Sequence, residues 1–160
     1  MKFILDGMLG KLARWLRMMG HDVQYSTTLN DSELLETTKK ENRILLTRDL
    51  ELYQRAIAKN AQAYYIEGQT EAEHLAELSQ RFGISLTIDL TQSRCPKCNT
   101  HLRSVPKEDV AEKVEKNTLL HYNEFWNCSN CGAIYWQGAH WAKIFATLDN
   151  AKLKQKKEIC

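Results

Sequence analysis

The chain has 160 residues, of which 43% are hydrophobic and 26% are charged, with only two prolines and seven glycines. This composition is typical of a globular protein and excludes the collagen-like, low-complexity and disordered classes. Apolar runs such as residues 44–46 are far shorter than the roughly 18 residues of a membrane-spanning helix, so we expect a cytoplasmic protein with no membrane partner. The net charge of +2 is too even to indicate nucleic-acid binding by itself.

Charge and cysteine are unevenly distributed along the chain. Residues 1–94 carry 12 basic and 13 acidic side chains, whereas residues 95–160 carry 10 basic and 7 acidic ones. All five cysteines lie in the second part. We therefore expect two domains, residues 1–91 and residues 92–160.

The first domain alternates predicted strands with predicted helices. Short apolar runs indicate buried strands, apolar residues at helical spacing indicate amphipathic helices, and Thr70 to Glu73 form a capping box. The expected elements are strand 2–5, helix 9–19, strand 23–25, helix 31–40, strand 44–47, helix 50–59, strand 63–66, helix 70–83 and a fifth strand at 86–90. This order predicts an α/β fold whose mostly parallel sheet is covered by helices on both faces.

Three aspartates occupy positions where such a sheet binds ligands. Asp6 and Asp49 each follow a strand directly, and Asp31 opens the helix that leads into the third strand. Ligands bind at the carboxyl ends of parallel strands, and clustered carboxylates suit Mg²⁺ or Mn²⁺, which can activate water for phosphodiester hydrolysis. A bound ion should also raise thermal stability by relieving repulsion. The local alternative is that each aspartate only caps a helix.

Three ordered motifs carry a family resemblance: DGMLGKLARWLR at 6–17, GHD at 20–22 and LTRD at 46–49, followed by two cysteine pairs. They resemble the PIN-like ribonucleases named after the carboxyl-terminal domain of the Mut-seven exonuclease. The resemblance implies a three-layer PIN-like fold and a Mg²⁺- or Mn²⁺-dependent ribonuclease. It also implies that Asp6, Asp31 and Asp49 are the catalytic, metal-binding carboxylates. Asp22 is a weaker candidate, since a turn residue would fit its position after Gly20 equally well.

Three arginines are candidates for substrate binding, because guanidinium groups pair well with phosphate oxygens. They are Arg48, beside a proposed metal ligand, and Arg14 and Arg17 of the first predicted helix. For Arg14 and Arg17 a solvated helix face is the alternative, and Trp15 is assigned to packing. The expected partner is RNA, either single-stranded or resembling tRNA or rRNA.

The second domain contains two Cys-x-x-Cys pairs. Cys95 and Cys98 form the first, and Cys128 and Cys131 the second, with the spacing at which four thiolates enclose a structural zinc ion. The 29 residues between the pairs exceed the usual range, so we expect a small zinc ribbon with an insertion at 106–116. With four thiolates available, His101, His121 and His140 are assigned to surface or packing roles, and Cys160 to a free thiol.

Aromatic and basic residues gather around the predicted ribbon. Most of the rings must pack, but one or two could stack on unpaired bases; they are Tyr122, Phe125, Trp126, Tyr135, Trp136 and Trp141. The basic run 152–157 indicates either a solvated helix end or a phosphate contact.

Two other functions are also compatible with the sequence. In the first, a non-catalytic module binds nucleic acid or protein through its zinc ribbon, and the aspartates are helix caps. In the second, the first domain is a phosphoacceptor receiver, although that fold would have a paired acidic motif after its first strand, where only Asp6 is present.

Overall fold

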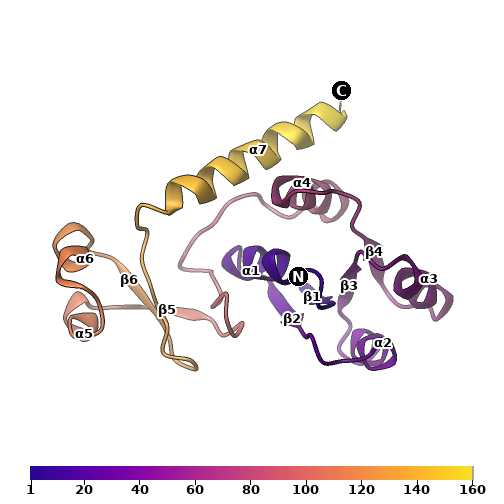
Figure 1. Cartoon of the computed structure of the whole chain (residues 1–160), viewed down its shortest axis with the longest axis horizontal. Helices are drawn as coiled ribbons and strands as arrows, with labels where there is room; N and C mark the ends of the chain where they lie inside the picture. The colour runs from indigo at the N-terminus through magenta and orange to yellow at the C-terminus, as the bar shows by residue number, and fades with distance from the viewer. Residues whose placement is uncertain (160) are drawn as a thin grey trace.

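The computed structural model describes residues 1–159, so the predicted free thiol Cys160 lies outside the described residues. Its first part is built on a four-stranded sheet of β1 (Lys2–Leu5), β2 (Asp22–Tyr25), β3 (Ile44–Thr47) and β4 (Ala63–Tyr65). The strand order is β2-β1-β3-β4, and every pairing is parallel (Figure 1). The predicted α/β class and parallel sheet are confirmed.

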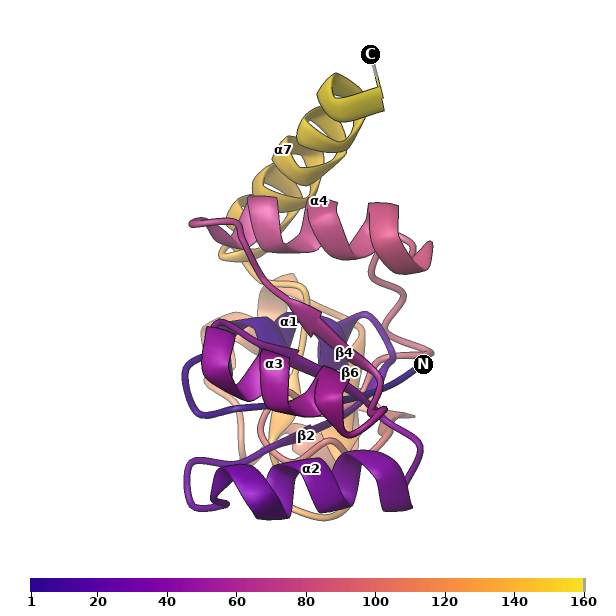
Figure 2. The same ribbon diagram turned by 90° about the vertical axis from the view of Figure 1, so that its right-hand side faces the viewer.

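Helices cover both faces of this sheet because side chains along a strand alternate between its faces. Phe3 and Leu5 of β1 pack with the apolar faces of α1 (Gly10–Met18) and α4 (Glu71–Phe82). Ile4 points the other way and packs with α2 (Asp31–Lys40) and α3 (Leu50–Ala58). In Figure 2, α4 and α2 lie on opposite sides of the strands. The result is the expected three-layer architecture.

Helix boundaries follow local sequence signals. Asn30 and Thr70 precede α2 and α4, and each forms a capping box with the glutamate three residues later. Helix α4 ends at Gly83, whose φ of +70° is the left-handed conformation that glycine adopts readily at a helix end. The capping box predicted at Thr70 is confirmed.

The expected fifth strand is wrong. Residues 86–90 are all described, and none of them belongs to a strand. Leu86 and Leu90 are nevertheless buried, Leu86 against the core of the sheet and Leu90 against the ribbon. The apolar pattern thus reflects a connecting segment that packs on two cores without pairing to β4.

The second part contains a three-stranded antiparallel sheet of β5 (Leu102–Val105), β6 (Phe125–Cys128) and β7 (Ile134–Tyr135). The short helices α5 (Lys107–Val110) and α6 (Lys116–His121) lie between β5 and β6, in and just beyond the predicted insertion. They project at one end of the molecule (Figure 1).

The last helix, α7 (Trp141–Ile159), returns from the ribbon to the first part of the chain. It lies beside α4 in both views (Figures 1 and 2), and its Leu148 and Ala151 are buried in the core that also contains Leu75 and Ala76 of α4. Lys154 of α7, in the basic run, forms an ion pair with Glu73 at 3.5 Å. The helix therefore begins against the ribbon with Trp141, and its later residues Leu148 and Ala151 pack on the first domain. Among the described helices, none combines the length and hydropathy needed to cross a membrane.

Candidate active site and metal centre

Asp6 and Asp49 lie at the carboxyl ends of the neighbouring strands β1 and β3 and are joined through Thr47. The Thr47 hydroxyl donates to Asp6 Oδ2, and Oγ1 of Thr47 accepts the backbone N–H of Asp49 at 2.9 Å. Asp6 Oδ1 accepts the N–H of Met8 at 3.1 Å. Both Asp6 and Thr47 are buried, so the bridge fixes the geometry of this edge.

Asp49 is also a helix cap, which is the role that the alternative interpretation of the sequence gives it. Its Oδ1 accepts the N–H of Leu52 at 3.1 Å, and it is the N-cap of α3. A cap uses one carboxylate oxygen and leaves the other available, so capping and ligand binding are compatible.

Asp31 lies on a different element and is engaged by a different partner. It is the first residue of α2, and its Oδ2 forms an ion pair with Arg55 of α3 at 3.1 Å. Asn30, and not Asp31, caps the helix. Across residues 1–159, the four cysteines are the only group of three or more acidic, histidine or cysteine side chains close enough to share one ion. The three predicted carboxylates are thus not close enough in this structure to share one ion.

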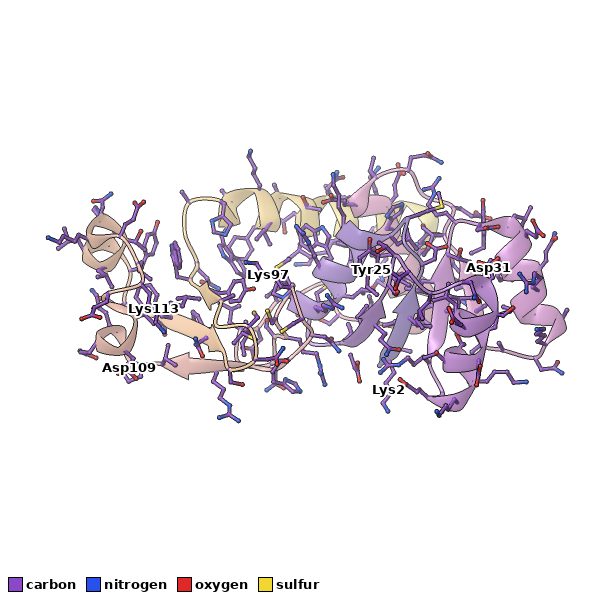
Figure 3. All side chains as sticks on the ribbon, turned by 60° about the horizontal axis from the view of Figure 1, so that its bottom comes forward. Lys2, Tyr25, Asp31, Lys97, Asp109 and Lys113 are labelled. Atoms are coloured by element: carbon purple, nitrogen blue, oxygen red, sulfur yellow. The ribbon has the colours of Figure 1, made fainter. Side chains whose placement is uncertain are left out.

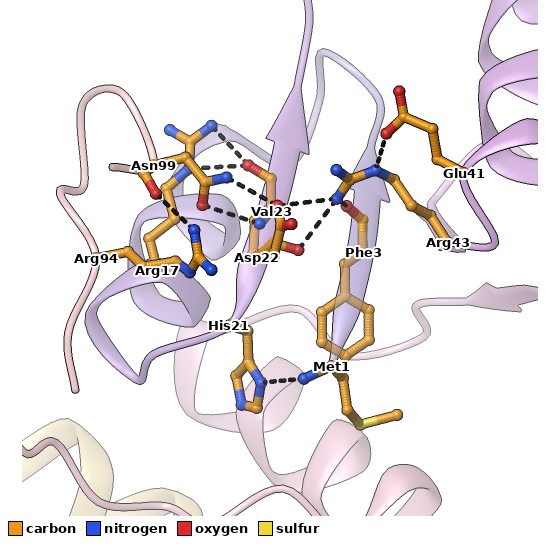
Figure 4. A network of polar contacts seen from close by, with 10 residues as sticks. All are labelled: Met1, Phe3, Arg17, His21, Asp22, Val23, Glu41, Arg43, Arg94 and Asn99. Atoms are coloured by element: carbon orange, nitrogen blue, oxygen red, sulfur yellow. Dashed lines mark hydrogen bonds and ion pairs between the residues drawn. The ribbon is translucent and has the colours of Figure 1, made fainter. Parts of the chain in front are cut away.

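Asp22 is at the opposite end of the sheet. It begins β2 and pairs in register with Lys2, whereas Asp6 follows the last residue of β1. Asp22 Oδ1 accepts hydrogen bonds from Arg43 at 3.0 Å and from the Asn99 amide at 2.8 Å (Figure 4). Partial burial alone would raise the pKa of Asp22, but these two donors hold it below its usual value. Asp22 therefore lies away from the edge that holds Asp6 and Asp49 and is engaged by structural partners.

Arg17 is not a free phosphate ligand, and it does not lie on a solvated face either. It is buried; its Nε and Nη2 donate to the carbonyl of Val23 at 3.0 and 2.8 Å, and its Nη1 donates to Pro96 O at 3.0 Å. Burial lowers the pKa of Arg17. Arg14, one turn earlier, is exposed. The predicted pair of binding arginines is thus divided into one structural and one accessible residue.

Arg48 lies beside Asp49 but reaches toward the segment before α4. Its Nη1 donates to the carbonyl of Gly68 and lies 3.3 Å from Nε2 of His74. The same His74 nitrogen is 2.8 Å from Gly68 O. His74 was not predicted as a site residue, because its contact with Arg48 joins residues 26 positions apart. Trp15 is buried as predicted, and its Nε1 also donates to Glu71 at 2.9 Å.

The four predicted zinc ligands meet at one point. Their sulfurs all lie within 4.8 Å of one another, with Cys98 3.3 Å from Cys128 and Cys95 3.7 Å from Cys131. A tetrahedron with Zn–S bonds of about 2.3 Å has edges of about 3.8 Å, whereas a disulfide bond is about 2.05 Å long. The donor set therefore fits a closed structural zinc site, and the Tyr135 hydroxyl, 3.1 Å from Cys95 Sγ, supports it from outside.

The surroundings of two of the four thiols shift their pKa values in opposite directions. Hydrogen bonds with the side chain and backbone of Thr100 lower the pKa of Cys98 to about 5, whereas burial raises that of Cys128 to about 11. A zinc ion would hold all four sulfurs as thiolates, because metal binding displaces the thiol protons.

Comparison with known proteins gives one family. Residues 1–148 match the family described as the Mut7-C RNAse domain. Neither a search of curated proteins nor a search of solved structures found a match to this chain. The match spans the parallel sheet, the cysteine cluster and the first part of α7. The chain therefore belongs to the Mut7-C RNase domain family.

Proposed function

We propose that this protein is a Mg²⁺- or Mn²⁺-dependent ribonuclease that hydrolyses phosphodiester bonds of RNA at the carboxyl edge of β1 and β3. Its zinc ribbon is structural and aids RNA binding. The observation that carries the proposal is the bridge from the Asp6 carboxylate through Thr47 to the backbone N–H of Asp49, which places both aspartates at the edge where parallel sheets bind ligands. Family membership supports the nuclease class.

The residues present suit a divalent cation. Carboxylate oxygens are the ligands that Mg²⁺ and Mn²⁺ prefer, and such an ion would supply an activated water and offset charge on the phosphate. In this proposal Thr47 and the N–H of Met8 orient Asp6. Asp49 contributes the oxygen that does not cap α3.

Asp31 is the third carboxylate of the proposal. Its ion pair with Arg55 is between side chains that are 42% and 38% exposed, and an ion pair this exposed contributes only about 0–1 kcal/mol. Asp31 can therefore leave Arg55 for a cation at small cost. Arg48 directly precedes Asp49, and in the proposal it contacts substrate phosphate.

The test is cleavage of end-labelled single-stranded RNA with added Mn²⁺ or Mg²⁺. Asp49→Asn is the informative variant, since asparagine caps a helix as well as aspartate does but lacks the charge. We expect metal-dependent cleavage that is lost in Asp6→Asn and Asp49→Asn and kept in Asp109→Asn, a change at an exposed aspartate of α5. Equal cleavage by all four proteins would contradict the assignment.

A non-catalytic binding module is the second candidate. It is favoured by the engagement of Asp49 in a cap and of Asp31 in an ion pair. Under that function the wild-type protein binds RNA but does not cleave it with either metal, and Asp49→Asn changes neither property.

A further inference from the structure

An apolar hollow of about 270 Å³ lies where α1, the ribbon and the start of α7 meet. Its walls include Leu90, Trp136, Trp141 and Ile144. Trp141 is buried and donates its Nε1–H to the carbonyl of Trp136 at 3.1 Å, which fixes the first turn of α7 against the ribbon. Ligand pockets usually measure roughly 300–1,000 Å³, so this hollow suits a single planar ring better than a whole cofactor.

A basic hollow adjoins the apolar one, and Pro96 lines both. Four of its seven lining residues are cationic and none is acidic: Lys11, Arg14, Arg17 and Lys97. Arg14 and Lys97 are exposed, and neither forms an ion pair within the described part of the chain. Figure 3 labels Lys97 and Tyr25, which both line this hollow. Two free cations on its wall favour an anionic partner.

A third hollow connects the basic one with the candidate active site. Gly10 and Lys11 line both hollows, and Met8 and His74 line the third. Met8 donates its N–H to Asp6, and His74 contacts Arg48. Lys11 is paired with Glu71 at 3.7 Å, which leaves Arg14 and Lys97 as the free cations. The three hollows thus follow α1 from its first turn, beside Asp6, to its last residue, Met18, beside the ribbon.

We propose that single-stranded RNA occupies this path, with phosphates on Arg14 and Lys97 and one unpaired base in the apolar hollow against Trp136. The direction of the strand toward Asp6 rests on the proposed function; the base pocket itself does not. RNA is a polyanion and therefore suits the basic hollow. Only an unstacked base can present a flat apolar ring to the adjoining apolar hollow. A base stacked in a duplex cannot enter, so the pocket selects single strands.

Fluorescence anisotropy with a short labelled oligouridine tests the pocket. All proteins carry Asp49→Asn so that no cleavage occurs. Ile144→Trp fills the hollow, and Ala142→Trp, an exposed change two residues earlier on α7, is the matched control. We expect Ile144→Trp to weaken binding about 5- to 150-fold, the range for loss of one stacked base, and Ala142→Trp to leave it unchanged. Because Ile144→Trp could disturb packing, Trp136→Leu repeats the test, with zinc content and melting temperature measured for each protein.

An abasic oligonucleotide of the same length separates base from phosphate. It should bind the Ile144→Trp and Trp136→Leu proteins as well as it binds the parent. The pair Arg14→Gln and Lys97→Gln should weaken both oligonucleotides and reduce the salt slope of binding by about 1.4, or 0.7 per phosphate. Lys40→Gln with Lys59→Gln, two exposed lysines outside the three hollows, is the charge control.

Unchanged oligouridine binding by both pocket variants, or equal loss on the abasic strand, overturns the base pocket. This outcome is distinct from failure of the proposed function. With Asp49 restored, cleavage that Ile144→Trp and Trp136→Leu leave unchanged keeps the proposed nuclease standing without this inference. Pocket-dependent binding by a wild-type protein that never cleaves RNA leaves the base pocket standing without the nuclease.

Discussion

Arg17 of α1 donates a hydrogen bond to the carbonyl of Pro96, between the two cysteines of the first pair, at 3.0 Å. The same guanidinium holds the carbonyl of Val23 in β2. Asn99, just after that pair, donates its amide to Asp22 and accepts the N–H of Val23 at 3.0 Å. The zinc-binding turn is thus hydrogen-bonded to the edge strand of the sheet, and the ribbon is attached to the first domain by more than its covalent connection.

Removing this attachment should destabilise the protein. In Arg17→Met, the buried carbonyl of Val23 loses its donor, and we expect the free energy of unfolding to fall by about 2 to 3 kcal/mol. Chemical denaturation measures the change. Arg14→Met, on an exposed position one turn away, should stay within about 0.5 kcal/mol of wild type. Equal effects of the two changes would show that the guanidinium contacts add nothing.

Acid should destabilise the fold through His21. Burial, together with the positive amino group of Met1 at 3.2 Å, lowers the pKa of His21 to about 4. Below its unfolded-state pKa of about 6.5, the unfolded chain binds a proton that the folded chain rejects. We therefore expect stability to fall by about 2 kcal/mol between pH 6.5 and pH 4.

The variant His21→Gln isolates this effect from carboxylate titration. Its stability should vary less than that of wild type across the same window, as followed by urea denaturation at several pH values. Parallel pH profiles for the two proteins would assign the acid sensitivity to other groups.

Manganese should raise the melting temperature of the zinc-loaded protein. Binding to the folded state alone stabilises by about 2.7 kcal/mol at a hundredfold excess over Kd, which corresponds to about 5 to 11 °C for a chain of this size. Asp6→Asn should abolish the increase, and Asp109→Asn should keep it. This measurement reports on the carboxylates without requiring a substrate, so a shift that persists in Asp6→Asn would locate the ion elsewhere.

The packing of α7 on α4 should also be measurable. Leu148 is 3% exposed, and truncating such a leucine costs about 2 to 5 kcal/mol. Leu148→Ala should therefore lower the midpoint of thermal unfolding markedly. Leu153→Ala, on the same helix but 59% exposed, should leave it nearly unchanged. A small effect at Leu148 would mean that α7 separates easily from the sheet domain.

Most of the fold could be predicted because its signals are local. Short apolar runs predicted the four strands, the capping box predicted the start of α4, and the cysteine spacing predicted the thiolate cluster. The fifth strand was wrong because a buried connecting segment and a buried strand have the same apolar pattern.

Residue roles at the site were less predictable, because they depend on contacts distant in sequence. Arg17 is paired with carbonyls 79 and 80 residues away, and Asp22 with Asn99, 77 residues away. Nothing in the local pattern distinguishes these side chains from Arg14 or Asp6. The packing position of α7 could not be predicted either, because its apolar residues could pack against any neighbouring core.

The return of α7 has a consequence for synthesis of the chain. Ala76 of α4 leaves the ribosome well before Leu148, its neighbour in the core, and about 70 residues take roughly 4 to 14 seconds to translate. During that delay the face of α4 that α7 will cover is exposed, and both cysteine pairs are synthesised before the delay ends. Zinc can therefore bind and fold the ribbon before α7 is complete. The folded ribbon then places α7 next to the exposed apolar face of α4.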